Sequence, residues 1–318
     1  MSYQAVFLDH ASLDLGDLDL SPLQEVFDTL ELYPATAPDE VLERLSMADA
    51  VITNKVVLDA QTLQQLPKLK LILIAATGTN NVDLVAAKER GISVSNCQGY
   101  GTQSVAQHCM ALMLALATQL IPYHRTVEQG HWQKAQQFCL LDFPIMELAG
   151  KTLGIVGYGE LGQAVARLAE AFGMKIIIAS LPGREAPHRL PLTEVLKQAD
   201  VVTLHCPLTE QTKNLIGEDE LALMKPNALL INTARGGIVD EYALKSALMN
   251  NRLGGAATDV LSQEPPKQGN PLLDTKIPQL IVTPHSAWGS REARQRIVQQ
   301  MTENAQAFFG GTPIRVVA

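Results

Sequence analysis

Three side chains that could act together in one reaction each follow a strand-like segment in the second half of the chain. Arg235, Glu264 and His285 come shortly after three separate apolar runs. The carboxyl ends of parallel strands meet at one edge of a sheet, and ligands bind outside that edge. A guanidinium, a carboxylate and an imidazole are therefore expected to lie together where such a sheet binds its ligand.

These residue types suit hydride chemistry on a 2-oxo acid. Arg235 would bind the substrate carboxylate through two parallel hydrogen bonds and polarise the neighbouring carbonyl. His285 would supply the proton that the carbonyl oxygen needs, because the imidazole pKa lies near neutral pH. Glu264 beside it would favour the imidazolium. Taken singly, the arginine could be a surface ion-pair residue, the histidine a cap and Glu264-Pro265 a turn; together they predict catalysis.

A glycine pattern precedes these residues, Gly157-x-Gly159-x-x-Gly162, between the apolar segment 152–156 and a helical pattern. The first glycine permits a tight turn, the second lets the backbone approach a pyrophosphate, and the third lets helix and strand pack closely. The helix N-terminus adds free N–H groups and a partial positive charge. The pattern predicts a dinucleotide site; its alternative is a glycine-rich turn without a ligand.

The elements that must position these residues alternate between strand and helix patterns. In the N-terminal part, strands are expected at 5–8, 50–53, 69–76 and 92–95, and helices at 23–30, 39–47, 58–66 and 82–90. Later strands are expected at 152–156, 175–179, 200–205, 228–233, 254–260 and 280–284, with helices at 161–172, 192–198, 218–224 and 240–250. Helices are also expected at 102–117, near 123–128 and at 291–309, with an irregular segment at 130–150. This alternation predicts an α/β protein with two doubly wound parallel sheets.

Length and composition set further bounds. A chain of 318 residues favours two domains. The net charge of −8 argues against nucleic acid or a membrane surface as partner. Four widely spaced cysteines without a Cys-x-x-Cys pair suit a reducing compartment and predict neither a disulfide framework nor a metal site. The N-terminus lacks the basic segment of a signal peptide, and the apolar stretch 105–116 is too short to span a bilayer. We expect a cytoplasmic protein.

The motifs resemble those of the D-isomer-specific 2-hydroxyacid dehydrogenases over essentially the whole chain. The matching segments are the glycine turn 157–162, Cys206-Pro207-Leu208-Thr209 with Thr212, the segment 224–237 around Arg235, Asp259-Val260 with Glu264-Pro265, and Thr283-Pro284-His285. The resemblance implies a Rossmann cofactor domain at 99–289, inserted into a flavodoxin-like substrate domain made of 1–98 and 290–318. It also implies Arg235, Glu264 and His285 as the catalytic triad.

The same resemblance implies a set of cofactor contacts for NAD(H) or NADP(H). They are Gly157, Gly159, Glu160, Leu161, Gly162, Ser180, Arg184, Cys206, Pro207, Thr212, Thr233, Ala234 and Asp259. Thr233, Ala234 and Asp259 are expected near the nicotinamide. NAD-selective members carry an acidic residue at the end of the second strand to bind the adenosine ribose. Ser180 and Arg184 stand there instead, so NADPH is expected to be accepted alongside NADH; the alternative is that Arg184 touches nothing.

The resemblance also points to a substrate. Thr77 and Gly78 look like the loop whose backbone N–H groups meet the substrate carboxylate, the alternative being an ordinary glycine turn. This loop and the segment 286–293 resemble the glycerate dehydrogenase (hydroxypyruvate reductase) branch, which favours hydroxypyruvate and D-glycerate. Trp288 would limit substrate size, or else only pack. Glyoxylate or a longer 2-oxo acid is the alternative substrate, and a dinucleotide-sensing corepressor the alternative class. The family generally forms homodimers, here expected through 102–150.

Overall fold

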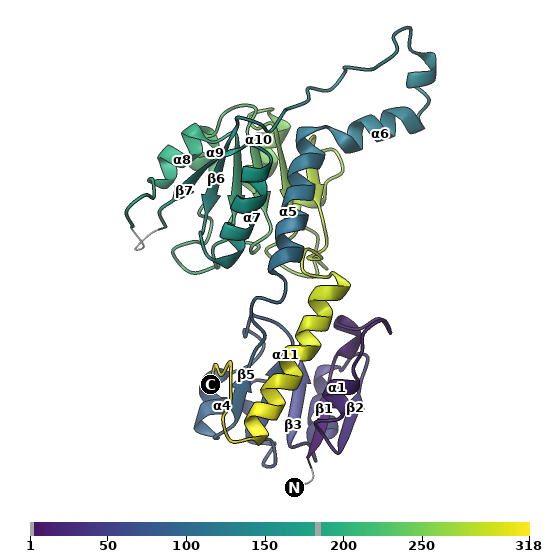
Figure 1. The fold of residues 1–318 in the computed structure, drawn as a ribbon, viewed down its shortest axis with the longest axis vertical. Coiled ribbons are helices and arrows are strands. Elements are labelled where there is room, and N and C mark those ends of the chain that lie inside the picture. Colours follow the sequence, from purple (N-terminus) through teal and green to yellow (C-terminus); the bar gives the residue numbers. More distant parts are fainter. Residues whose placement is uncertain (1–2, 182–185) are drawn as a thin grey trace. The chain divides into compact units, whose positions relative to one another are not determined.

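The chain divides into two compact units. The computed structural model describes residues 3–181 and 186–318. One unit consists of Met1–Gly101 with Gly289–Ala318, and the other of Thr102–Trp288 (Figure 1). These limits lie a few residues from the boundaries expected at 98/99 and 289/290. Each unit is built on one parallel sheet, which confirms the predicted fold class.

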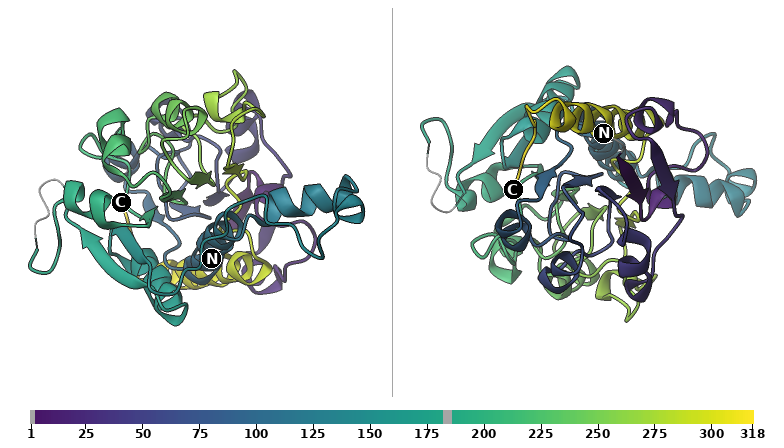
Figure 2. Two further views of the ribbon diagram at one scale, coloured as in Figure 1. Left: turned by 90° about the horizontal axis from the view of Figure 1, so that it is seen from above. Right: turned by 90° about the horizontal axis from the view of Figure 1, so that it is seen from below.

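The first unit holds five parallel strands in the order β2-β1-β3-β4-β5. They are β1 (Gln4–Phe7), β2 (Thr29–Leu32), β3 (Ala50–Thr53), β4 (Leu71–Ile74) and β5 (Ser93–Ser95). The short helices α2 (Val41–Leu45), α3 (Ala60–Gln64) and α4 (Leu84–Glu89) cover one face, and α1 (Ser21–Gln24) and α11 (Arg291–Phe309) the other. The right-hand view of Figure 2 shows the yellow α11 and the dark-blue helices on opposite sides of this sheet. All residues of β3 and β4 are buried, as expected of central strands covered on both faces.

The helix predicted at 23–30 is wrong. The helix α1 ends at Gln24, and Thr29–Leu32 forms the edge strand β2. The side chain of Asp28 accepts a hydrogen bond from the backbone N–H of Tyr3, and the N–H of Asp28 donates to the Tyr3 carbonyl. Pairing with β1 thus overrides the helical spacing of apolar residues, which continues in the sequence beyond the end of the helix.

The second unit holds six parallel strands in the order β11-β10-β9-β8-β6-β7. They are β6 (Thr152–Val156), β7 (Lys175–Ala179), β8 (Val201–Leu204), β9 (Leu229–Asn232), β10 (Gly255–Thr258) and β11 (Leu280–Val282). The helices α5 (Thr102–Ala117) and α7 (Glu160–Ala171) pack on one face, and α8 (Leu192–Gln198), α9 (Glu218–Leu223) and α10 (Glu241–Met249) on the other. The predicted elements of this unit agree with these bounds to within a few residues.

The strand order fixes where a ligand can enter the second sheet. The chain runs from β6 to β7 in one direction and then crosses back to β8, β9, β10 and β11 in the other. Its connections therefore diverge at the carboxyl ends of β6 and β8, and such a switch point leaves a crevice. Among the described residues one named strand, β7, lies beyond β6 on that side, and Leu190 adds a single parallel bridge to Ala179. The commonest Rossmann order has two strands there.

An arm made of residues 118–147 leaves the body of the second unit. It contains α6 (Leu120–Glu128) and the short helix η3 (Trp132–Lys134), and α6 buries none of its residues. Figure 1 shows it projecting past the end of α5. Within the described residues no single helix is long and apolar enough to cross a membrane. The pair α5 and α6, bent by 60°, reaches that length and hydropathy only together, and α5 buries nine of its residues in the core.

Candidate active site

The glycine turn after β6 is closed on one side and open on the other. Gly157 has a φ of +99°, and a Cβ there would lie 2.6 Å from the backbone N of Cys206. A Cβ on Gly162 would lie 2.2 Å from the carbonyl oxygen of Gly157. A Cβ on Gly159 would meet nothing within 4 Å. The outer two glycines are therefore required by close packing, while the middle one leaves space where a pyrophosphate could approach the backbone.

The helix α7 begins at this turn. Gly159 is its N-cap residue, and no side chain caps it, so the first N–H groups are available to an anion. Glu160 was expected to contact the cofactor. Its side chain accepts a hydrogen bond of 2.6 Å from the Thr102 hydroxyl, which ties α5 to the start of α7. Leu161 follows on the first turn and is half-buried.

His205, at the end of β8, was missed by the sequence analysis. It directly precedes Cys206 beside Gly157, and its Nε2 lies 2.9 Å from the Thr203 hydroxyl. Its Nδ1 is buried and makes no hydrogen bond to another described residue. Burial lowers the pKa of His205 to about 4, so the ring is neutral at pH 7. Burial likewise raises the pKa of the Cys206 thiol to about 11.

A second buried polar atom stands at the next strand end. Leu204 pairs with Asn232, which places His205 and Thr233 at neighbouring positions beyond the sheet. The hydroxyl oxygen of Thr233 is buried and makes no hydrogen bond within the described part of the chain. Buried polar atoms normally have partners, so two orphans beside an open glycine turn fit a site that a polar ligand such as a nicotinamide carboxamide completes.

The loop after Cys206 is held by Thr212. The Thr212 hydroxyl donates to the Pro207 carbonyl over 2.6 Å and accepts from the backbone N–H of Thr209 over 2.7 Å. Pro207 itself is exposed. Thr212 was expected as a cofactor contact. Both hydrogen bonds of its hydroxyl stabilise the conformation of this loop.

Ser180 follows β7 at the far edge of the crevice. Its N–H donates to the Leu190 carbonyl over 2.7 Å, and the residue is half-buried. The structure thus places a hydroxyl at the end of the second strand, where NAD-selective relatives of the fold have a carboxylate. Arg184 lies outside the described residues.

Arg235 stands on a turn that Asn232 holds. The Asn232 side chain donates to the Arg235 carbonyl over 2.9 Å and accepts from the Ala234 N–H over 3.0 Å. The guanidinium is exposed, and its Nη1 donates to the Ala234 carbonyl over 2.7 Å. No ion pair engages it within residues 3–181 and 186–318. Most of its donors therefore remain available to a carboxylate.

The turn that carries Arg235 packs on the loop that carries Glu264. A Cβ on Gly236 would lie 1.9 Å from the carbonyl oxygen of Leu261, so only glycine permits this contact. The N–H of Leu261 donates to Oε1 of Glu264 over 2.8 Å. The other oxygen, Oε2, lies 2.5 Å from Nδ1 of His285. The structure thus brings the Arg235 turn, Glu264 and His285 to one edge of the sheet, as the sequence predicted.

His285 is held in an uncommon backbone conformation. Its φ is +53°, and its N–H lies 2.8 Å from the Asp259 carbonyl and 3.0 Å from that of Thr283. With Nδ1 turned to Glu264, Nε2 is the ring nitrogen left to exchange a proton with a substrate. The side chain is 33% exposed, so a substrate can reach it.

Asp259, expected near the nicotinamide, has a carboxylate that is fully engaged within the chain. It is almost fully buried, and its carboxylate accepts from the Thr283 hydroxyl over 2.5 Å and from the N–H groups of Ser286 and Ala287, each over 2.9 Å. It therefore anchors the turn that bears His285. Ala234, also expected near the nicotinamide, is buried between Asn232 and Arg235.

The expected substrate contacts are divided between the two units. Thr77 and Gly78 follow β4 in the first unit, whereas Trp288 ends the second and is half-buried. The Thr77 hydroxyl donates to the Cys97 carbonyl over 2.9 Å, and the Asn96 side chain donates to the Thr77 carbonyl over 2.8 Å. These bonds hold the turn after β4 in a fixed shape.

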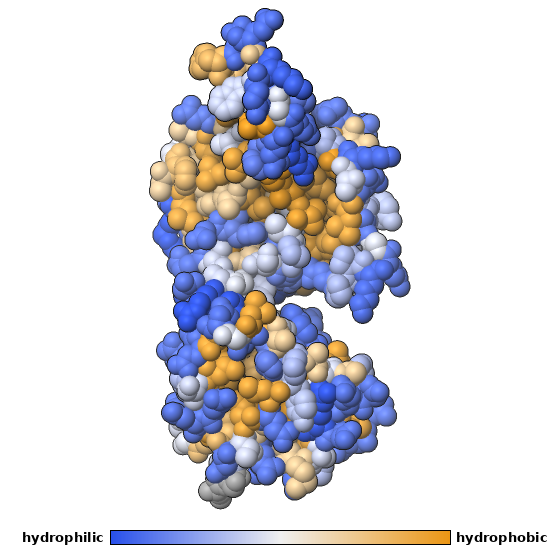
Figure 3. Space-filling model, turned by 90° about the vertical axis from the view of Figure 1, so that its right-hand side faces the viewer, coloured by the Kyte–Doolittle hydropathy of each residue, from blue (hydrophilic) through white to orange (hydrophobic). Residues whose placement is uncertain are grey.

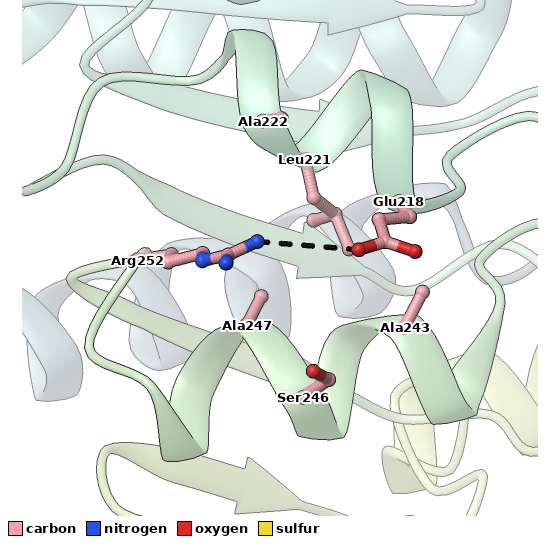
Figure 4. A pocket seen from close by; sticks show the side chains of 7 residues that line it. All are labelled: Glu218, Leu221, Ala222, Ala243, Ser246, Ala247 and Arg252. Atoms are coloured by element: carbon pink, nitrogen blue, oxygen red, sulfur yellow. Dashed lines mark ion pairs between the residues drawn. The ribbon is translucent and has the colours of Figure 1, made fainter.

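A shallow hollow elsewhere in the second unit contains none of these residues (Figure 4). It lies between α9 and α10 and is lined by Glu218, Leu221, Ala222, Ala243, Ser246, Ala247 and Arg252. Arg252 and Glu218 face each other across it at 4.0 Å. Among the described residues, no group of three or more His, Cys, Asp or Glu side chains could hold a metal ion.

Comparison with known proteins shows the family of the chain. Residues 110–287 match the family model described as "D-isomer specific 2-hydroxyacid dehydrogenase, NAD binding domain". The chain is 48% identical over 318 residues to a glycerate dehydrogenase of Methylorubrum extorquens, covering 100% of this chain and 99% of that protein. It is 36% identical over 320 residues to a hydroxypyruvate reductase of Blautia hydrogenotrophica, covering 98% of each.

A solved structure shows the same fold over the whole chain. An acyclic imino acid reductase in complex with NADPH and D-Arg superposes with a TM-score of 0.86 at 30% identity, covering 99% of this chain and 100% of that one. The chain therefore belongs to the D-isomer specific 2-hydroxyacid dehydrogenase family and is an NAD(P)-dependent oxidoreductase.

Proposed function

We propose that this enzyme reduces hydroxypyruvate to D-glycerate, and catalyses the reverse oxidation, with His285 as proton donor and acceptor. The observation that carries the proposal is the 2.5 Å contact between Glu264 and His285, next to the Arg235 turn and on the sheet edge that bears the glycine cradle. The names of the relatives at 48% and 36% identity support the choice of substrate.

Arg235 is proposed to bind the substrate carboxylate. Its guanidinium is exposed and has no competing carboxylate among the described residues. A planar fork holds a carboxylate in one orientation, which directs the adjacent carbonyl, and its positive charge draws electron density from that carbonyl. Asn232 and Gly236 fix the backbone from which the guanidinium reaches.

His285 is proposed to deliver the proton. A reduced nicotinamide, when bound, would supply the hydride, and the substrate oxygen would then need a proton. The Glu264 carboxylate can only accept at Nδ1, so it favours the proton on that nitrogen and fixes the orientation of the ring. Nε2–H is then the group that donates to the oxygen, and the same nitrogen takes the proton back during oxidation.

Thr77 and Gly78 are proposed to bind the substrate carboxylate through their backbone N–H groups. The bonds from Thr77 to Cys97 and from Asn96 to Thr77 support this role, because they fix the turn without using the Thr77 N–H. Trp288 is proposed to limit the length of the substrate. Its replacement by alanine should raise kcat/KM for longer 2-oxo acids relative to hydroxypyruvate.

NADPH is proposed as an accepted cofactor alongside NADH. Ser180 carries no charge that would repel a 2′-phosphate, and a solved relative binds NADPH. The variant Ser180→Asp should lower kcat/KM with NADPH while leaving that with NADH within about threefold, because a carboxylate repels the phosphate but accepts from the ribose hydroxyls. A wild-type enzyme inactive with NADPH would overturn this proposal.

A substrate panel tests the main proposal. Hydroxypyruvate, glyoxylate and a branched 2-oxo acid would be compared at fixed NADH and at fixed NADPH, by following the loss of reduced-nicotinamide absorbance. Hydroxypyruvate should give the highest kcat/KM. A higher value for glyoxylate or the branched acid would assign the enzyme to that substrate instead.

Two variants test the residue roles. His285→Ala should lower kcat by about 10²–10⁴-fold with little change in cofactor affinity. Arg235→Lys should raise KM and lower kcat, because a point charge does not replace the guanidinium fork. Arg252→Lys, in the hollow between α9 and α10, is the matched control and should leave both constants unchanged. Wild-type kcat in His285→Ala would remove the histidine from the mechanism.

We also propose a cytoplasmic homodimer that buries the arm. The arm exposes large apolar side chains over most of its length: Leu120, Val127, Trp132, Phe138, Leu141 and Ile145. Figure 3 shows hydrophobic residues gathered on the side of the second unit from which the arm projects. Exposed apolar clusters of this kind mark interaction surfaces. Phe138→Asp with Leu141→Asp should convert a dimer to a monomer in light scattering; an unchanged mass would reject the arm as the contact.

A further inference from the structure

His108, on α5, has no role in the site described above, yet it touches the turn that bears His285. Its Nε2 lies 3.0 Å from the hydroxyl oxygen of Thr283 and 3.7 Å from Oδ1 of Asp259. The Thr283 hydroxyl lies 2.5 Å from the same Asp259 oxygen. A side chain from a core helix thus ends a chain of polar contacts that leads to the proposed proton donor.

The direction of these hydrogen bonds follows from the atoms. An ionised carboxylate can only accept, so the single hydroxyl hydrogen of Thr283 points to Asp259. The Thr283 oxygen then has only lone pairs left for His108, and Nε2 of His108 must carry a hydrogen. His108 therefore donates to Thr283, and Thr283 donates to Asp259. Both hydrogen bonds point toward the carboxylate, and each strengthens the other.

Asp259, whose position is held by Thr283 and His108, in turn holds the backbone around His285. Its carboxylate accepts from the N–H groups of Ser286 and Ala287, and its carbonyl accepts from that of His285. Successive N–H groups around a left-handed residue form a nest that an anion fills, and here the anion is a side chain of the same chain. A left-handed conformation is unfavourable for a non-glycine residue, so the nest must be held for His285 to keep its φ of +53°.

A second contact from α5 reaches the same turn. The Ser104 hydroxyl donates to the Ala287 carbonyl over 2.6 Å. Ser104 and His108 are four residues apart and lie on one face of the helix. The helix therefore holds the His285 turn at two points, at Thr283 before the histidine and at Ala287 after it.

We propose that His108 is a positioning residue for His285, acting through Thr283 and Asp259. The inference rests on the proposed role of His285 as proton donor. His108 does not touch the substrate; it holds the nest so that Nε2 of His285 stays where the proton is needed. Its loss is expected to slow proton transfer and to leave cofactor binding intact.

The test compares His108→Ala with His108→Gln. The alanine variant removes the donor and should lower kcat by about tenfold or more, since small misplacements of a catalytic group cost up to about 10²-fold. The glutamine variant keeps a neutral N–H donor at a similar reach and should restore most of the rate. The control is Gln107→Ala, an exposed neighbour on the same helix, which should match wild type.

Two readouts separate positioning from a loss of structure. The solvent deuterium isotope effect on kcat should rise in His108→Ala, because proton transfer becomes slower than the steps around it. The NADH dissociation constant, from fluorescence, should stay within about twofold. A lower kcat with an unchanged isotope effect and weaker NADH binding would overturn the inference in favour of a structural role.

Double variants show whether a failed prediction concerns the role of His108 or the proposed role of His285. In a His285→Ala background, His108→Ala should cause no further loss, because the effect passes through His285. Thr283→Val should reproduce His108→Ala and should not add to it, whereas Thr283→Ser should retain the rate. Wild-type turnover in His285→Ala would reject the proposed function. Strong loss there, with wild-type turnover in His108→Ala, would reject only the role of His108.

Discussion

The two units have sheets of the same winding but fill their switch points differently. In the first unit, β1 lies between β2 and β3 as β6 lies between β7 and β8 in the second. After β1 comes Asp9, a buried residue whose carboxylate accepts from the N–H groups of Asn54, over 2.9 Å, and Lys55, over 2.7 Å. After β6 comes the glycine turn, whose middle residue faces open space.

This difference separates what a fold provides from what a site adds. Doubly wound topology brings backbone N–H groups to the carboxyl ends of the strands in both sheets, and such groups attract an anion. The first unit supplies that anion itself, as Asp9. The second leaves the position without a side chain, so that an external phosphate can take it. The two sheets therefore share a topology without sharing a function. The side chains at the turn after the central strand determine whether an external anion can bind.

The largest effect is expected at Gly162. A Cβ there meets the Gly157 carbonyl at 2.2 Å, so Gly162→Ala must push the helix from the strand. Overpacking of this severity costs about 3 kcal/mol. Urea unfolding should show that loss together with loss of NADH binding. Unchanged stability would mean that the turn is not closed by packing, and the contrast with the first unit would weaken.

His205 should make the second unit sensitive to acid. Its folded pKa of about 4 lies below the unfolded value of 6.5, so between these values the unfolded state binds the extra proton. The stability that the neutral ring contributes is present above pH 6.5 and is lost as the pH falls toward 4, by about 3 kcal/mol in all. The variant His205→Asn tests this. Asparagine is the residue that follows the corresponding strand of the first unit, where Asn54 comes after β3.

The measurement is the fall in melting temperature between pH 7.5 and pH 4.5, for wild type and for His205→Asn. The variant should lose less stability over this range, because an amide does not titrate. An equal fall in both proteins would show that His205 is not held neutral by its burial.

Asp9 should matter for stability alone. Asp9→Ala leaves the N–H groups of Asn54 and Lys55 without their carboxylate, at a cost of about 1–3 kcal/mol. Cofactor affinity should not change, because Asp9 belongs to the first unit and the glycine turn to the second. Calorimetry would give the melting temperature and a fluorescence titration the NADH affinity. Weaker NADH binding would contradict the separation of the two roles.

Gly159 should show the reverse pattern and the smallest effect on stability. Its Cβ would meet nothing within 4 Å, so Gly159→Ala should lower the free energy of unfolding by less than about 1 kcal/mol, the cost of a poorer N-cap residue. The added methyl group occupies the space in which a pyrophosphate would lie, so NADH affinity should fall by about tenfold or more. Retained affinity would show that the cofactor does not approach this side of the turn.

Much of this protein follows from its sequence. The apolar runs and the glycine turn predict the sheet of the second unit to within a few residues, because buried parallel strands and their turns are local signals. Arg235, Glu264 and His285 could be assigned to one edge because parallel strands end together. The edge strand β2 could not be predicted from the sequence. In a short, half-exposed segment, pairing with the neighbouring strand determines the conformation more than the residues of the segment do.

Only the tertiary structure decided how the site is held. Glu160, Thr212 and Asp259 stand in motifs that predict cofactor contacts. Only the structure shows that their side chains also bond to Thr102, Pro207 and the His285 turn. No motif singles out His205 or His108 in the sequence, yet the Nδ1 atom of His205 is buried at the switch point and His108 reaches the His285 turn from α5. The physical reason is that the spacing of residues fixes which strand end a side chain occupies. Its hydrogen-bond partners come from segments far away in the chain, and packing alone brings those into reach.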